Sequence, residues 1–174
     1  MYTSRGNLEA EFFRSWSPGA VDRLYAQFRH HYYDHILFYR VVKGFVAQFG
    51  GNDSVRMHQW NRIKVPDEPV ITGNARGTIS FARDGKDSRD NDLFINLADN
   101  HRLDTVRFKG VTGFPVLGRI TRGMETADSL YNGYGDQVFR QYDTLFRDKT
   151  VFLSHYPRLD SLIRVKIIRQ RKLE

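Results

Sequence analysis

Residues 36–51, ILFYRVVKGFVAQFGG, constrain the fold more than any other part of the chain. This stretch holds two runs of strand-forming residues, ILFYRVV and FVAQF. Lys43 and Gly44 lie between the two runs and are typical of a tight turn. The pattern therefore predicts two strands joined as a β-hairpin.

An arginine lies inside the first of these predicted strands. Alternation along a strand places Arg40 on one face, between Phe38 and Val42. One interpretation is structural: an inward-pointing charge or a buried ion pair that protects the edge of a sheet. The other is a fixed hydrogen-bond donor on the floor of an apolar pocket, with Gln48 on the second strand as its neutral polar partner.

Five further stretches have the apolar pattern of short strands: residues 7–12, 78–82, 93–97, 114–121 and 162–169. One helix is predicted from Pro18, with Ser17 as its N-cap, to about Tyr32, and a second over residues 123–132. Residues 51–74 are expected to form a long loop, and part of residues 145–154 to be helical.

The order of these elements indicates the fold class. About seven or eight short strands without regular strand–helix alternation favour an antiparallel barrel or sandwich, with helices packed outside, over a parallel sheet. The chain has 174 residues, and we predict that residues 1–174 form a single domain. We expect a monomer.

Composition excludes several functional classes. The chain has no cysteine, which rules out disulfides, thiolate chemistry and Cys-ligated zinc. No run approaches the roughly 18 apolar residues of a membrane span, and the first residues lack the apolar region of a signal peptide, so we expect no membrane association. The net charge of +7 favours acidic partners, but the basic residues are scattered without interleaved aromatics, which disfavours nucleic acid.

Motifs for bound metals and cofactors are absent or incomplete. The chain contains no P-loop, no dinucleotide glycine fingerprint and no G-x-S-x-G nucleophile turn. His31 and His35 are four residues apart beside Asp34, but positive imidazoles near a helix C-terminus have an electrostatic reason to be there. The acidic loop at residues 83–92 does not match an EF-hand. We predict neither a metal nor a cofactor.

Five blocks of sequence, in order, resemble those of cyclophilin-type peptidyl-prolyl isomerases. They are FYRVVKGFVAQFGG, GNARGTISFAR, LFINLADNHRLD, FPVLGRITRGMETAD and YPRLDSLIRVKII, and the resemblance extends from Gly6 to Ile168. It implies a mainly β fold, a closed eight-stranded antiparallel barrel capped by two α-helices. It also implies a surface groove for proline-containing peptides, with unfolded or folding proteins as clients.

The resemblance also implies roles for individual residues. Arg40 matches the essential arginine of the family, and Gln48 matches the glutamine of the same motif, so both are the predicted catalytic residues. The predicted substrate-binding residues are Phe45, Val46, Ala82, Arg83, Asp92, Phe94, Leu103 and Phe114. Within this set, Phe45 is the expected floor of the proline pocket, and the backbone at Ala82 and Arg83 is expected to run along the peptide.

This chemistry agrees with the interpretation of Arg40 as a donor. An X-Pro bond rotates over a barrier of roughly 18 to 20 kcal/mol because resonance gives the C–N bond partial double-bond character. A donor directed at the prolyl nitrogen favours the twisted transition state, and an apolar pocket holds the ring. Neither a nucleophile nor a cofactor is needed. Arg40 is the candidate donor.

Several positions depart from the usual family pattern. Tyr39, Arg83, Asp92 and Arg102 stand where relatives commonly carry histidine, asparagine, glutamine and tryptophan, and about seven extra residues precede Phe114. Asp92 has two alternatives: a charge-assisted pair with Arg40 within about 4 Å, or a position in the groove that selects basic peptides. The chain is therefore expected to be either a working isomerase or a peptide-binding or protein-binding module with little turnover.

Overall fold

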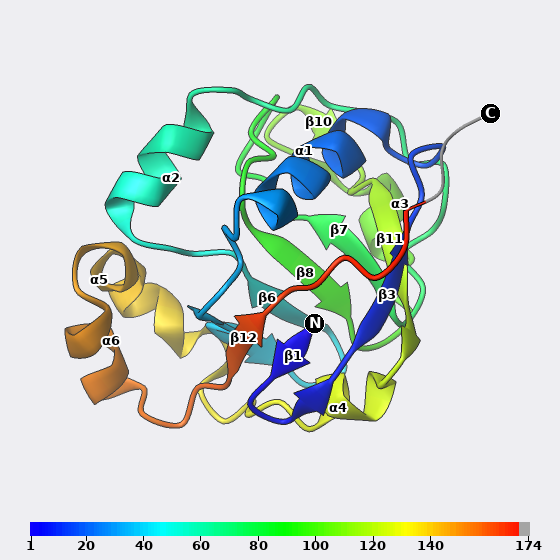
Figure 1. The fold of residues 1–174 in the computed structure, drawn as a ribbon. Helices are drawn as coiled ribbons and strands as arrows, with labels where there is room; N and C mark the ends of the chain where they lie inside the picture. The colour runs from blue at the N-terminus through cyan, green and yellow to red at the C-terminus, as the bar shows by residue number, and fades with distance from the viewer. Residues whose placement is uncertain (171–174) are drawn as a thin grey trace.

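Two antiparallel sheets form the body of the molecule (Figure 1). The computed structural model describes residues 1–170, so the last four residues of the predicted domain and of its basic end lie outside the described part. The larger sheet contains, in order, β3 (Glu9–Phe12), β11 (Val116–Arg122), β7 (Thr78–Phe81), β8 (Leu93–Asn96), β6 (Val46–Phe49) and β5 (Arg40–Val42). The smaller sheet contains β2 (Gly6–Asn7), β1 (Tyr2–Thr3), β12 (Ser161–Arg164) and β4 (Ile36–Leu37).

The predicted hairpin is confirmed. Strands β5 and β6 pair antiparallel, with Arg40 opposite Gln48 and Val42 opposite Val46. Gly44 lies in the connecting turn with a φ of 71°, a conformation that glycine adopts at no steric cost. The hairpin places Arg40 and Gln48 side by side at one edge of the larger sheet.

The prediction of one continuous strand from residue 36 to residue 42 was wrong. The run contains two short strands in different sheets, because β4 pairs with β12 and β5 pairs with β6. Where the chain passes from one sheet to the other, simple alternation of side chains fails. Phe38 therefore packs in the main core, and Tyr39 packs with Leu37 in a separate cluster.

The helices are more numerous than the two main ones that were predicted, and the prediction that part of residues 145–154 is helical is confirmed. Helix α1 (Pro18–Arg29) begins as predicted, and α4 (Met124–Asp128) lies inside the predicted range. The described residues also contain α2 (Ser54–Asn61), α3 (Arg102–Thr105), the 3₁₀-helix η1 (Gly135–Gln141), α5 (Tyr142–Arg147) and α6 (Lys149–His155). The expected long loop of residues 51–74 therefore includes a helix, which Asp53 caps by accepting from the backbone N–H of Arg56 at 2.9 Å.

The fold is mainly β, with several antiparallel sheets and helices, as predicted. A third, two-stranded sheet pairs β9 (Arg107–Phe108) with β10 (Val111–Thr112) within the extra residues. Closure of the strands into an eight-stranded barrel stays a prediction. No helix in residues 1–170 is long and apolar enough to cross a bilayer.

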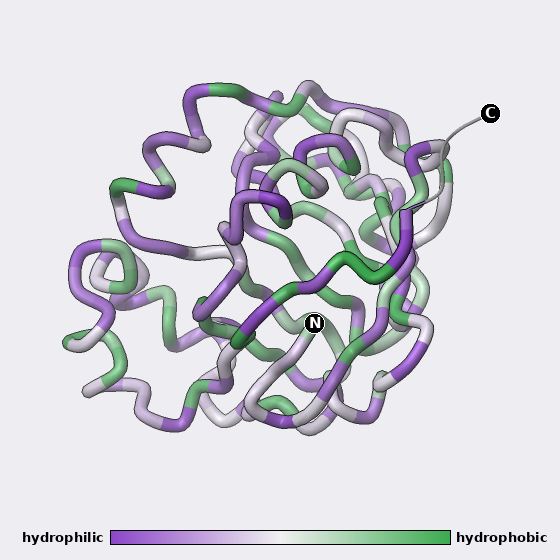
Figure 2. The backbone as a smooth tube through the Cα atoms, viewed as in Figure 1, coloured by the Kyte–Doolittle hydropathy of each residue, from purple (hydrophilic) through white to green (hydrophobic). Residues whose placement is uncertain are grey.

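Three separate apolar clusters stabilise this arrangement. The main core includes Leu24 of α1, Phe49, Phe81 and Ile95, and Figure 2 shows hydrophobic stretches through the central strands. Each fully buried side chain of this size contributes roughly 1.5 to 3 kcal/mol. A second cluster joins Leu37 and Tyr39 to residues 135–155, which we call the helical segment; its buried members there are Val138, Leu145 and Phe152.

Candidate functional site

The third apolar cluster lies on the face of the larger sheet that turns away from the main core. Along β6, Ala47 and Phe49 belong to the main core, so the alternating residues Val46 and Gln48 point to the other face. Across the strands, Gln48 pairs with Arg40 on one side and with Phe94 on the other. The register therefore forms a row on one face in which a guanidinium, an amide and an aromatic ring are neighbours.

We call this third cluster the pocket cluster. Its buried members are Val46, Phe94 and Leu103, and its half-buried members are Phe45, Ala82, Val106 and Phe114. Six of the eight predicted substrate-binding residues are therefore together. The rings of Phe94 and Phe114 meet edge to face, with centroids 5.9 Å apart. The half-buried rings leave part of the apolar cluster exposed at the surface.

Val106 is a pocket residue that the sequence reasoning missed. It follows α3 directly, three residues after Leu103, and its backbone N–H donates to the carbonyl of Arg102 at 3.0 Å. The spacing of three residues between Leu103 in the short helix and the apolar residue that directly follows the helix is the signal that could have identified it.

Arg40 makes two hydrogen bonds to side chains. Its Nη1 donates to Oε1 of Gln48 at 3.2 Å, and its Nε donates to Oδ1 of Asp136 at 2.6 Å. The guanidinium carbon lies 5.6 Å from the ring centroid of Phe45 and 5.3 Å from that of Phe139. Arg40 is therefore ion-paired to a carboxylate that is itself 65% exposed, and it also borders the pocket cluster, so both interpretations of Arg40 stay open.

Sequence reasoning also missed Asp136 and Phe139. Both residues belong to η1, which packs against β5. A 3₁₀-helix has three residues per turn, so it lacks the 3.6-residue apolar period that identifies α-helices. No signal in the sequence pointed to these two residues.

Asp92 does not pair with Arg40. Its carboxylate oxygens accept hydrogen bonds from the hydroxyls of Tyr39, at 3.1 Å, and Tyr142, at 3.0 Å. Burial, with a smaller contribution from the charge of Asp90, raises the pKa of Asp92 to about 7. The carboxylate is thus hydrogen-bonded to two tyrosines that pack in or against the second cluster. The alternative that Asp92 lies in the groove and selects basic peptides gains no support.

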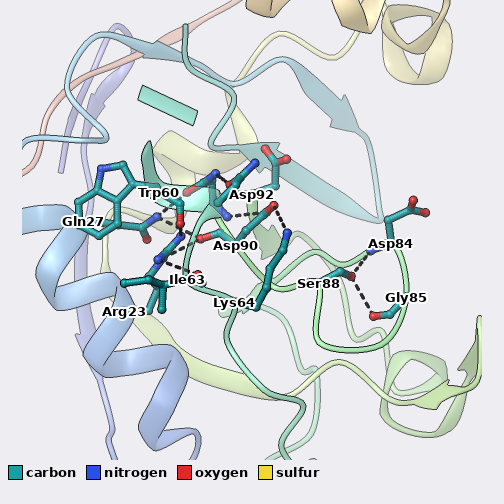
Figure 3. Close-up of polar contacts among 12 residues, drawn as sticks. Arg23, Gln27, Trp60, Ile63, Lys64, Asp84, Gly85, Ser88, Asp90 and Asp92 are labelled. Atoms are coloured by element: carbon teal, nitrogen blue, oxygen red, sulfur yellow. Dashed lines mark hydrogen bonds and ion pairs between the residues drawn. The ribbon is translucent and has the colours of Figure 1, made fainter. Parts of the chain in front are cut away.

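The loop before β8 fixes the position of Asp92. The backbone N–H of Asp84 donates to the hydroxyl of Ser88 at 2.8 Å. Arg23 and Gln27 of α1 both donate to the backbone carbonyl of Asp90, at 3.2 and 3.1 Å (Figure 3). The loop is therefore bonded both within itself and to α1, and Asp92 follows it directly.

The side chain of Arg83 forms hydrogen bonds to the backbone of the chain itself. It is buried, and it donates to the backbone carbonyls of Phe108, Val111 and Gly113 at 2.8 to 3.2 Å. Its guanidinium carbon lies 4.5 Å from the ring centroid of Phe114, and burial lowers the pKa of Arg83. Arg83 therefore connects β7 to the β9–β10 hairpin, and the expected contact of its backbone with a peptide stays a prediction.

Arg102 is a second arginine beside the ring of Phe45. Its side chain is exposed, and its guanidinium carbon lies 4.7 Å from the ring centroid of Phe45. The predicted floor of the proline pocket therefore has two guanidinium groups near it. Within residues 1–170, no group of three or more His, Cys, Asp or Glu side chains could hold a metal ion.

Comparison with known proteins identifies a family model and relatives that are similar in sequence to this chain. Residues 1–148 match the family model described as cyclophilin type peptidyl-prolyl cis-trans isomerase/CLD. A peptidyl-prolyl cis-trans isomerase of Acinetobacter baylyi is 29% identical over 134 residues, covering 76% of this chain and 70% of that protein. Peptidyl-prolyl cis-trans isomerase A of Dickeya dadantii is 36% identical over 131 residues, covering 74% and 67%.

Solved structures show the same fold at lower identity. A cyclophilin type peptidyl-prolyl cis-trans isomerase of Cryptosporidium parvum superposes with a TM-score of 0.61 at 23% identity, covering 75% of this chain and 83% of that chain. A cyclophilin from Hirschia baltica superposes with a TM-score of 0.63 at 16% identity, covering 94% and 70%.

Proposed function

Because the chain belongs to the cyclophilin-type peptidyl-prolyl cis-trans isomerase family, we propose that it accelerates rotation about X-Pro bonds, with Arg40 as the donor to the prolyl nitrogen. One observation carries the proposal: Arg40 and Gln48 lie in register beside the apolar pocket cluster. A donor and an apolar ring site are the two features that this reaction requires.

The mechanism follows from the resonance of the peptide bond. A hydrogen bond from Arg40 to the prolyl nitrogen withdraws its lone pair from conjugation with the carbonyl and so lowers the barrier to rotation. The guanidinium is planar and carries several N–H donors in a fixed geometry. Gln48 orients it by accepting from Nη1, and the rings of Phe45, Phe94 and Phe114 hold the prolyl ring while the preceding carbonyl turns.

Proline-containing peptides are the proposed ligands. The Cryptosporidium parvum protein of similar fold was also solved in the presence of the dipeptide Ala-Pro. We extend this to unfolded or folding protein clients, because an X-Pro bond must be exposed to enter a surface groove. The proposed site is built from a single chain, which is consistent with action as a monomer.

A specific contact favours a second candidate, a peptide-binding module with little turnover. Asp136 accepts from Nε of Arg40 at 2.6 Å, and a negative charge at this distance offsets part of the positive charge that a substrate would meet. In this case the pocket cluster would bind proline-containing segments without accelerating their isomerisation.

Exchange NMR on a short, uncharged X-Pro peptide tests the proposal. We expect the wild-type protein to accelerate cis–trans exchange and Arg40→Ala to lose about 100-fold in rate, the usual cost of removing a transition-state donor. Arg164→Ala, at an exposed residue of β12, is the matched control and is expected to keep full activity.

The same experiment separates the two candidates. Peptide binding without faster exchange in the wild-type protein would favour the binding module. A large loss of thermal stability in Arg40→Ala would instead favour the structural ion-pair interpretation of this arginine. We expect a small change, because Asp136 is 65% exposed and exposed ion pairs contribute little to stability.

A further inference from the structure

The contacts of Arg40 leave one side of its guanidinium for a ligand. An arginine has five N–H donors, and Arg40 uses one on Asp136 and one on Gln48. Within residues 1–170, Nη2 has no hydrogen-bond acceptor. The bond from Nε to Asp136 therefore does not compete with the Nη donors, and it fixes the plane in which they lie.

The 3₁₀ geometry of η1 brings a second residue to Arg40. Asp136 and Phe139 are three residues apart, so a helix with three residues per turn presents them on the same face. Both contact Arg40, one through the ion pair and the other through its ring. Val138 is fully buried in the second cluster, which fixes the rotation of η1.

The helical segment is itself bonded to two residues that lie directly before strands β5 and β8. The hydroxyl of Tyr142 donates to Asp92 at 3.0 Å and contacts the hydroxyl of Tyr39 at 3.2 Å. The hydroxyl of Tyr156 donates to the carbonyl of Gln137 at 3.1 Å. Asp136 is thus presented by a packed, hydrogen-bonded element, although its own carboxylate is exposed.

From this geometry we propose that Asp136 is a positioning residue for the isomerisation, fixing the guanidinium of Arg40 so that its Nη donors face the prolyl nitrogen. The inference rests on the proposed function. It assigns the helical segment a part in catalysis, because η1 supplies a group that acts through Arg40 without touching the substrate. Phe139 supports the same orientation through its contact with the guanidinium.

The test compares Asp136→Asn, Asp136→Ala and Asp136→Glu with the wild type on an uncharged X-Pro peptide. We expect kcat to fall about 10-fold in the Asn and Ala variants, with KM nearly unchanged, because a misdirected donor weakens only the transition-state contact. The Glu variant is expected to recover part of the loss. Asp143→Asn, at an exposed acid of α5 in the same helical segment, is the matched control and is expected to change nothing.

A spectroscopic readout distinguishes positioning from a general structural role. The Nε–H group of Arg40 is expected to give a separate, slowly exchanging NMR signal in the wild-type protein, identified by its loss in Arg40→Lys. In Asp136→Asn the signal should move toward the averaged position of exposed arginines, while the melting temperature changes by less than about 2 °C.

The outcomes are distinct. An active wild type whose activity is unchanged in Asp136→Asn would overturn the positioning role and leave the proposed function intact. A rise in activity would also overturn it, because it would show that Asp136 restrains Arg40 from its substrate. An inactive wild type would overturn the proposed function and the inference together. A fall in kcat together with this shift of the Nε–H signal in Asp136→Asn would support the inference.

Discussion

Arg40 and Arg83 border the same pocket cluster but use their hydrogen bonds differently. Each guanidinium lies near the ring of a pocket phenylalanine, Arg40 at 5.6 Å from Phe45 and Arg83 at 4.5 Å from Phe114. Arg83 donates from Nε, Nη1 and Nη2, always to backbone carbonyls. Among residues 1–170, Arg40 finds acceptors for Nε and Nη1, and both acceptors are side chains.

The kind of hydrogen-bond acceptor distinguishes the two arginines more clearly than their charge does, because both carry the same guanidinium group. Backbone carbonyls belong to the fold, so donors used on them hold a loop in place and cannot act on a ligand. Side-chain partners orient a guanidinium while some of its donors stay available. The donors still available are consistent with a structural role of Arg83 at the β9–β10 hairpin and with the proposed role of Arg40 as a donor to the substrate.

The largest expected effect comes from Arg40→Lys. Lysine keeps the positive charge but has no planar fork, so it cannot bond Asp136 and Gln48 while also facing a substrate. We expect a loss of about 100-fold in kcat/KM with a small change in stability. Exchange NMR and thermal unfolding measure the two quantities, and full activity in this variant would contradict the assignment of Arg40.

Arg83→Ala should show the opposite pattern. Removing a buried guanidinium leaves three backbone carbonyls of the hairpin without their donor. We expect the free energy of unfolding to fall by about 1 to 3 kcal/mol, measured by urea denaturation. Hydrogen exchange should become faster at residues 107–113. A loss of activity as large as that of Arg40→Lys, with unchanged stability, would break the comparison between the two arginines.

The direction in which stability changes with pH shows whether Asp92 has a cationic partner. Its pKa is raised from the ordinary 3.8 to about 7, so the folded state binds more protons than the unfolded state between these values. The contribution of Asp92 to stability is therefore greatest below pH 4, falls as pH rises to about 7, and is constant above that. A carboxylate paired with Arg40 would have a lowered pKa and the opposite slope.

Asp92→Asn isolates this contribution. The unfolding free energy of the wild type relative to the variant should fall by about 1.4 kcal/mol per pH unit between pH 4 and pH 7, because the folded wild type keeps a proton on Asp92 that the unfolded chain has lost. Thermal or urea unfolding at several pH values measures it. A wild type that gains stability relative to the variant across this range would show that Asp92 has a cationic partner.

The sequence predicted the parts of the site that depend on strand register. Alternation and turn chemistry identify the β5–β6 hairpin, and with it the pairing of Arg40 and Gln48. The sequence did not predict contacts made by irregular or inserted elements. Asp136 comes from a 3₁₀-helix without an α-helical period, and helix α2 has no buried residue, so no apolar stripe marked it. The long side chain of Arg83 reaches a hairpin whose position depends on tertiary packing.

The smallest expected effect concerns Arg102, an exposed guanidinium 4.7 Å from the ring centroid of Phe45. Unlike Arg83, it is not buried in a loop, and a peptide on Phe45 would lie near its charge. We expect X-Pro peptides with a glutamate beside the proline to react about 2- to 3-fold better than those with a lysine, an effect that weakens at high salt because exposed charges are screened. Arg102→Ala should remove the preference while Arg164→Ala keeps it. If the preference for glutamate persists in Arg102→Ala, the positive charge that attracts the glutamate is that of Arg40. The contrast between Arg40 and Arg83 would then account for the preference without Arg102.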